Sequence, residues 1–221
     1  MAPAAPIPSQ EGGPEPSSGI TLHSRHVFGV KPDVNGSVHW IDDVSCIYVA
    51  GNNVVQYATD TKAQKLFPGL EGGLGIRAMA VSGNRRYLAV AQQMRDHGTC
   101  VVYDLHTGRK KRVLTAAENE STSFVSVAFS ADNKFLVTQG AAPDWNLTYW
   151  AWDKGRVIVS TKTSNSRGAR IHEVSINPQD PSLVCVIGDE IFKFLRMQEG
   201  AFKAVPNQLA KLKKKSLEIF G

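Results

Sequence analysis

Histidine, cysteine and serine side chains that could build a catalytic or metal-binding site occur in this chain, but none has the spacing of such a site. The six histidines form no HExxH pair, and no GxSxG sequence marks a nucleophilic serine. The three cysteines, Cys46, Cys100 and Cys185, lie far apart inside apolar runs without a CxxC, which indicates buried thiols in a reducing compartment. We therefore expect no enzyme, and no catalytic, cofactor-binding or metal-binding residues.

The glycine-rich stretch GLEGGLG at residues 69–75 has the composition of a phosphate-binding loop. It lacks the lysine of a P-loop, and it leads into a strand-like run rather than a helix. We therefore interpret it as a loop between two repeats.

An aromatic residue followed by aspartate, a turn and a second run occurs twice, as Tyr103-Asp104 and as Trp152-Asp153. The aspartate can accept hydrogen bonds from main-chain N–H groups in a tight turn, and a glycine shortly afterwards supplies the backbone freedom that such a turn needs. We expect the aromatic ring to pack between two sheets. The four residues are therefore predicted to be structural, at the end of a third strand and before a fourth.

Three stretches with one pattern define an internal repeat. MAVSGNRRYLAVA, VAFSADNKFLVTQ and VSINPQDPSLVCV begin at Met79, Val127 and Val174, at intervals of 48 and 47 residues. A period of this size is typical of propeller blades, kelch units and pairs of HEAT helices. In each stretch large and small residues alternate, as in a strand covered on both faces, and a polar turn and a second strand follow. The lack of helix-length amphipathic runs in the repeats argues against HEAT helices.

These repeats predict an all-β fold of WD40-type β-propeller blades over residues 25–205. A weaker first blade is expected before them, with strands at SVHWI, CIYVA, NVVQYA and QKLF, and with Trp40 where the others have a small residue. Four blades are thus predicted. Because β-propellers have about four to eight blades, and an incomplete ring exposes a strand edge and a blade face, we expect a partial or truncated propeller.

Both ends of the chain differ in composition from the repeats. Residues 1–24 are rich in Pro, Gly, Ser and Ala without a signal-peptide pattern, and are predicted to be disordered. The tail at 206–221 is basic, and its apolar residues have the spacing of a short amphipathic helix, which suits a membrane surface or a partner, or else marks a truncation. Without the tail the chain is close to neutral, so no nucleic-acid partner is expected. No run reaches the roughly 18 apolar residues of a membrane span.

Two loops are candidate protein-binding sites. The loop AAPDWNL contains Asp144, Trp145 and Asn146, and its tryptophan is either an exposed interface anchor or a packing residue against the next blade. The loop QQMRDHG, with Arg95, Asp96 and His97, occupies the equivalent place in the preceding blade. Because equivalent loops emerge on the same rim of a propeller, the two loops could form one contact surface.

A basic run is the third candidate for protein binding. It follows the HTG turn and consists of Arg109, Lys110, Lys111 and Arg112. Four adjacent cations suit an acidic partner, such as a tubulin tail. The alternative interpretation is an exposed edge strand that its charges protect from pairing with another chain.

An ordered set of fragments carries a resemblance to a known family. HVFGVKPDVNGSVHWIDD, GNNVVQYATDTKAQKLFPG, NRRYLAVA, NLTYWAWDK and NPQDPSLVCVIGDEIFKFLR together resemble the N-terminal WD region of the cilia- and flagella-associated protein 57 family, over residues 25–205. The resemblance implies a non-catalytic adaptor of the motile-cilium axoneme. It implies axonemal protein partners that include inner-arm dyneins and the nexin–dynein regulatory complex, and the basic run adds microtubules as a candidate partner. After Val205 the chain departs from the family, which continues with another blade.

Two other interpretations stay open on the residues alone. The first is a general cytosolic WD scaffold, with a cytoplasmic location for a short form of the protein. The second is a propeller that associates with RNA through its basic tail. Expression restricted to ciliated cells would argue against the first. The second predicts that removal of residues 207–221 abolishes RNA crosslinking, and crosslinking that never exceeds background would argue against it.

Overall fold

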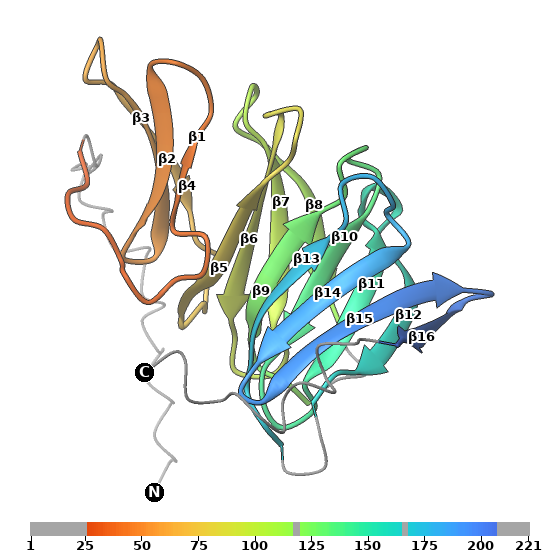
Figure 1. Ribbon diagram of the computed structural model, residues 1–221. Helices are drawn as coiled ribbons and strands as arrows, with labels where there is room; N and C mark the ends of the chain where they lie inside the picture. Colours follow the sequence, from red (N-terminus) through yellow and green to blue (C-terminus); the bar gives the residue numbers. More distant parts are fainter. Residues whose placement is uncertain (1–25, 117–119, 165–167, 207–221) are drawn as a thin grey trace, which may run out of the picture.

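The computed structural model describes residues 26–116, 120–164 and 168–206, and these fold into four antiparallel sheets of four strands each (Figure 1). We call the sheets blades 1 to 4 in chain order. Their strands are β1 (Val38–Trp40), β2 (Ser45–Ala50), β3 (Asn53–Ala58) and β4 (Gln64–Pro68); β5 (Gly75–Val81), β6 (Tyr87–Gln93), β7 (Thr99–Asp104) and β8 (Lys110–Thr115); β9 (Phe124–Phe129), β10 (Leu136–Gly140), β11 (Asn146–Ala151) and β12 (Arg156–Lys162); β13 (Ile171–Ile176), β14 (Leu183–Gly188), β15 (Ile191–Gln198) and β16 (Ala201–Val205).

Each blade is a meander in which consecutive strands are neighbours. The first strand of a blade lies at the centre of the assembly, where β9 contacts both β5 and β13, and the fourth strand lies at the outside (Figure 1). The prediction of an all-β fold with four propeller-type blades is therefore confirmed. The N-terminal segment 1–24 and all but the first residue of the 206–221 tail lie outside the described residues.

Burial follows the position of a strand within its blade. All six residues of β7, which lies inside blade 2, are buried, and its Val, Cys, Thr and Tyr side chains suit a strand covered on both faces. The neighbouring outer strand β8 is exposed at every position except Leu114. An outer strand that carries lysine and arginine is protected against pairing with another chain.

Three apolar cores fill the three spaces between consecutive blades. Alternate residues of one strand point into different cores: Val101 and Tyr103 of β7 belong to the core between blades 1 and 2, and Cys100 and Val102 to the core between blades 2 and 3. The third core includes Tyr149 and joins blades 3 and 4. The period-two alternation in the sequence thus reflects strands that are covered on both faces.

The outward faces of blades 1 and 4 have no further blade against them in the part of the chain that the structure describes. On blade 1, the outward face carries Trp40, whose exposed fraction is 57%, with Cys46 and Tyr57 beside it in the strand register. On blade 4, the outward rings of Phe192 and Phe194 lie 5.1 Å apart. These faces agree with the expected partial propeller.

The register corrects one expectation about the first blade. Trp40 pairs with Cys46 as Val81 pairs with Leu88, so Trp40 occupies a position that is large in the repeats. The small position belongs to His39, whose pKa is lowered because burial disfavours the charged imidazole. The expectation that Trp40 replaces a small residue was therefore wrong.

A segment that precedes the first strand enters the centre of the fold. Asn35 forms a parallel bridge with Ala78 on β5. Its side-chain Nδ2 donates a hydrogen bond to the main-chain oxygen of His172 on β13 at 2.9 Å, and to that of Val125 on β9 at 3.5 Å. One residue therefore links the central strands of blades 2, 3 and 4.

Candidate protein-interaction surfaces

The two ends of the blades carry different connections. We call linker rim the end with the β6–β7, β10–β11 and β14–β15 loops and the links between blades. We call turn rim the opposite end, where the first strand of each blade turns into the second and the third into the fourth (Figure 1). Across residues 26–116, 120–164 and 168–206, the structure has no helix with the length and hydropathy of a membrane span.

The β6–β7 loop on the linker rim presents Arg95 and Asp96 to solvent, with His97 partly buried. Its two sides are tied to the link between blades 2 and 3, because Met94 and Gly98 donate main-chain hydrogen bonds to residues 122 and 121, each at 2.9 Å. The charged tip of the loop is therefore held in place by hydrogen bonds on both sides. These three residues occupy the rim that the sequence predicted for them.

The β10–β11 loop lies on the same rim and is tied to the same link. The Asp144 carboxylate accepts a hydrogen bond from the main-chain N–H of Glu120. Ser121 donates its hydroxyl hydrogen to the Ala141 oxygen at 2.7 Å. Residues 120–123 thus lie between the two loops and bring them together. Asn146, at the start of β11, is partly buried.

Trp145 is not an exposed anchor, which corrects one of the two interpretations of this loop. Its exposed fraction is 7%, and it packs in the core between blades 3 and 4. The backbone at Trp145 has a φ of 53°, and its main-chain oxygen accepts hydrogen bonds from the N–H and the hydroxyl of Thr163 at 3.0 and 2.6 Å. The alternative interpretation, a packing residue against the next blade, describes its position.

The basic run does not form one patch. Arg109, Lys110, Lys111 and Arg112 are all exposed, but a bulge in the pairing of β7 with β8 turns them to different sides. Lys110 pairs with Tyr103, whose ring faces blade 1, and Lys111 lines a hollow between blades 2 and 3. Arg112 donates a hydrogen bond to the main-chain oxygen of Asp153 on blade 3. The side chains of this run therefore face two different spaces, one between blades 1 and 2 and one between blades 2 and 3.

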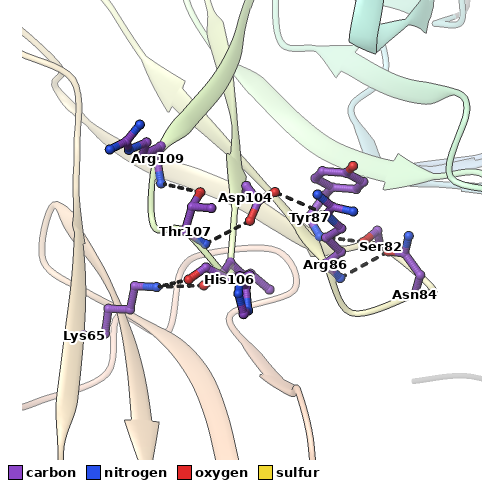
Figure 2. Close-up of polar contacts among 10 residues, drawn as sticks. Lys65, Ser82, Asn84, Arg86, Tyr87, Asp104, His106, Thr107 and Arg109 are labelled. Atoms are coloured by element: carbon purple, nitrogen blue, oxygen red, sulfur yellow. Dashed lines mark hydrogen bonds and ion pairs between the residues drawn. The ribbon is translucent and has the colours of Figure 1, made fainter.

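Tyr103 and Asp104 are the last two residues of β7. Tyr103 binds blade 1, and Asp104 holds the turn that follows. The Tyr103 hydroxyl donates a hydrogen bond to the Pro68 oxygen of blade 1 at 2.8 Å. The Asp104 carboxylate accepts the main-chain N–H of Thr107 at 3.0 Å and forms an ion pair with Arg86 at 3.2 Å (Figure 2). The Thr107 hydrogen bond, and then the Arg86 guanidinium, hold the pKa of Asp104 below its usual value.

Trp152 and Asp153 are not the structural equivalents of Tyr103 and Asp104. Tyr103 pairs with Leu88 of the second strand of its blade, and the residue in that place on blade 3 is Trp150. Trp152 lies two residues further on, in a short 3-10 helix (Trp152–Lys154) that Gly155 ends with a φ of 65°. Asp153 is exposed there. The expectation that both dipeptides mark the same point of the blade was therefore wrong.

The turn rim has a hollow between blades 1 and 2, which the sequence did not reveal. Lys65 extends from β4 to the β7–β8 turn of blade 2, where its Nζ donates hydrogen bonds to the oxygens of Leu105 at 2.7 Å and His106 at 3.2 Å (Figure 2). From the other side, Arg85 donates a hydrogen bond to the Trp40 oxygen at 2.7 Å. A comparison of matching positions across the repeats is the signal that could have found this hollow.

The three cysteines differ in burial. Cys100 is fully buried, and burial raises the pKa of its thiol to about 12. Cys46 and Cys185 are partly exposed, so the expectation of buried thiols holds for one residue of the three. Within the described ranges, no group of three or more His, Cys, Asp or Glu side chains is arranged to hold a metal ion.

Comparisons with known proteins point to one group of relatives. No protein-family model matches the chain. The cilia- and flagella-associated protein 57 of Mus musculus is 38% identical over 190 residues, which cover 85% of this chain and 15% of that protein. The cilia- and flagella-associated protein 57 C of Tetrahymena thermophila is 27% identical over 202 residues, or 86% of the chain and 15% of that protein.

A third relative is also named as a cilia- and flagella-associated protein. The cilia- and flagella-associated protein 44 of Mus musculus is 25% identical over 176 residues, which cover 80% of the chain and 9% of that protein. The chain thus spans less than a sixth of the length of these three relatives. The resemblance expected from the sequence is confirmed: over most of its length, this chain of WD-type blades is similar to a segment of cilia- and flagella-associated protein 57.

Proposed function

We propose that the chain is a non-catalytic WD-repeat scaffold of the cilium or flagellum, located in the axoneme. The observation that carries this proposal is the similarity to proteins named for cilia and flagella in an animal, a ciliate and an alga. A scaffold acts by holding partners in fixed positions, so it needs a stable body and accessible loops rather than a reactive centre.

The geometry supports a scaffold in two ways. Three cores join the four blades, and Asn35 links the central strands of three of them. On the linker rim, Arg95 and Asp96 are exposed on a loop whose base is hydrogen-bonded to the link between blades 2 and 3. Loops on a stable framework are where proteins most often carry their binding residues. We assign protein binding to this rim, with Asp144 and Asn146 beside the loop.

The finer role rests on the resemblance found in the sequence. Within the axoneme, the scaffold positions inner-arm dyneins beside the nexin–dynein regulatory complex. The exposed cations Arg109, Lys110, Lys111 and Arg112 suit the acidic surface of a microtubule as a further partner. The chain matches only a part of its longer relatives.

Fractionation of ciliated cells tests the proposal. A tagged full chain is expressed in these cells, and the axonemes are extracted with detergent and then with increasing salt. We expect the chain in the detergent-resistant axonemes. Recovery of the chain only in the soluble cytosol would contradict the axonemal role and favour the general cytosolic scaffold.

A paired variant tests the linker rim in the same assay. Replacing Arg95 and Asp96 by alanine removes one cation and one anion from the exposed loop, and we expect weaker retention in the axonemes. The control variant replaces Glu199 and Lys203 by alanine, which removes an exposed ion pair of 3.2 Å on blade 4. Equal retention of both variants would show that this loop is not part of the binding surface.

A further inference from the structure

The hollow at the turn rim between blades 1 and 2 has a volume of about 750 Å³. Part of its origin lies at one position of the second strand of each blade. In each blade, one residue of the second strand pairs with the last residue of the first strand, and the position in question is the residue just before it. This position holds Tyr87 in blade 2 and Phe135 in blade 3. In blade 1 the same position holds Ser45, which lines the hollow.

The facing position on the next blade carries no ring here, whereas blade 3 has a tryptophan there. In blades 2, 3 and 4, one residue of the third strand pairs with Leu88, Leu136 and Val184, respectively. The facing position lies two residues further along the chain. It holds Leu105 in blade 2, Trp152 in blade 3 and Met197 in blade 4.

Between blades 2 and 3 the two positions are filled by large rings. The rings of Tyr87 and Trp152 lie 4.8 Å apart. Between blades 3 and 4, Phe135 and Met197 both pack on the core. A hollow of about 540 Å³ lies beside the rings of Tyr87 and Trp152 as well. Ser45 and Leu105 carry no ring, and this enlarges the hollow between blades 1 and 2 to about 750 Å³. Its apolar lining, which includes Leu105 and Ile41, suits a large apolar group.

The polar lining of this hollow has one sign of charge. Lys65, Arg85 and Arg86 line it, with His106 beside them, and none of its lining residues is an aspartate or glutamate. Arg86 is partly neutralised by its ion pair with Asp104. Lys65 donates to two main-chain oxygens and has a third ammonium hydrogen, and Arg85 uses one of five donors on the Trp40 oxygen. The hollow therefore offers donors to an anionic group.

A buried acceptor also lines the hollow. The side-chain oxygen Oε1 of Gln56 is buried, and it has no hydrogen-bond partner among the described residues. A buried acceptor without a donor lowers stability, by about 1–3 kcal/mol in typical cases, and a ligand with an N–H group removes this penalty.

We propose that this hollow binds an extended acidic segment of a partner protein, with one large apolar side chain seated beside Leu105 and flanking carboxylates at Lys65 and Arg85. This inference rests on the proposed scaffold function, because it names the chemistry of one partner. A peptide supplies all three groups that the hollow lacks: an apolar side chain for its volume, carboxylates for its cations, and main-chain N–H groups for Gln56.

Fluorescence anisotropy with synthetic peptides tests the proposal on the full chain. The probe is a fluorescein-labelled Gly-Glu-Glu-Phe-Glu-Glu-Gly peptide, and the comparison peptides have Ala for Phe, or Gln for all four Glu. We expect saturable binding of the probe, weakened about tenfold or more by either change, because each removes one of the two kinds of contact. No binding of the probe, or equal binding of the three peptides, would overturn the proposal.

Variants of the chain locate the site. Ser45→Phe places a ring in the hollow, at the position where blades 2 and 3 carry Tyr87 and Phe135. We expect it to weaken probe binding about tenfold or more. If this variant does not fold, Leu105→Trp fills the hollow from the facing blade and carries the same expectation. Unchanged probe binding in the folded variant would place the binding site elsewhere and overturn the proposal.

A matched pair of charge variants separates the site from general attraction. Arg85→Gln removes a cation of the hollow, and Arg156→Gln removes an exposed cation on β12. We expect Arg85→Gln to weaken binding about fivefold or more, and Arg156→Gln to change it by about twofold or less. Equal effects would show that net charge alone attracts the peptide. Axonemal retention of the Ser45→Phe chain, measured by fractionation, distinguishes failure of this site from failure of the scaffold function.

Discussion

The indole ring of Trp152 meets the phenol ring of Tyr87 with their centroids 4.8 Å apart and their planes inclined by 61°. The contact joins the 3-10 turn of blade 3 to the second strand of blade 2. Trp152 is 3% exposed, and its Nε1 donates a hydrogen bond to the Asn133 oxygen at 2.9 Å. The ring is thus held by packing from the neighbouring blade and by a polar contact within its own.

Trp152→Ala should lower the free energy of unfolding by about 3–5 kcal/mol, because it leaves a cavity between two blades. Chemical denaturation followed by circular dichroism measures this change. The control is Trp40→Ala, which removes the same side chain from the outward face of blade 1, where 57% of it is exposed. A loss for Trp152→Ala no larger than that of the control would contradict its place in the core.

Asn35→Asp should loosen the centre of the fold. The change puts a carboxylate oxygen where the amide donates to the main-chain oxygens of His172 and Val125. We expect a loss of about 1–3 kcal/mol in the free energy of unfolding, and faster hydrogen exchange in β9 and β13. Asn53→Asp, at the first residue of β3, is the control. Unchanged exchange in β13 would show that Asn35 does not link the blades.

Stability should fall in acid as the turn carboxylates are protonated. The pKa of Asp104 is lowered in the folded chain by the Thr107 N–H and then by Arg86, and that of Asp180 by Ser182 and Arg196. A lowered pKa stabilises the folded state above the ordinary value of 3.8, and this contribution is lost as the pH falls through the folded pKa.

Urea denaturation between pH 7 and pH 3 measures this dependence. Asp104→Asn should be less stable than the parent chain at pH 7, with a difference that shrinks below about pH 4 because the parent loses the same charge. A difference that stays constant over the whole range would show that the Asp104 charge does not contribute.

The three thiols should differ in reactivity toward iodoacetamide. Cys100 is buried and its pKa is raised to about 12, so at pH 8 it is neutral and shielded. Cys46 and Cys185 are partly exposed. Mass spectrometry after brief labelling should find modification at these two, and at Cys100 only after unfolding in urea. Labelling of all three at one rate in the folded chain would contradict the burial of Cys100.

The strands and their alternation could be predicted from the sequence because they depend on local pattern. Runs such as YLAVA and FLVTQ carry both the period of two and the turn residues that bound them, and both lie in the expected second strands. Blade 1 was found with equal precision although its pattern is weaker.

The side-chain environments could not be predicted because they depend on neighbouring blades. Trp145 stands among polar loop residues, and only the third core shows that it is buried. The dipeptides at Tyr103 and Trp152 look alike, and only the strand pairing shows that they are offset by two residues. The hollow between blades 1 and 2 is enlarged because Ser45 stands where the next two blades carry aromatic rings, a difference that no local pattern marks.

The meander of each blade has a mechanical consequence. Because every blade is made of consecutive strands, the strand ladders among the described residues lie within blades. The blades meet chiefly through side chains, single hydrogen bonds such as that of Lys65, and the short contact of Asn35 with Ala78. A force that shears one blade past another therefore acts on packed side chains, while a ladder resists with many hydrogen bonds at once. Under such a shearing load, the blades would separate before any of them unravels.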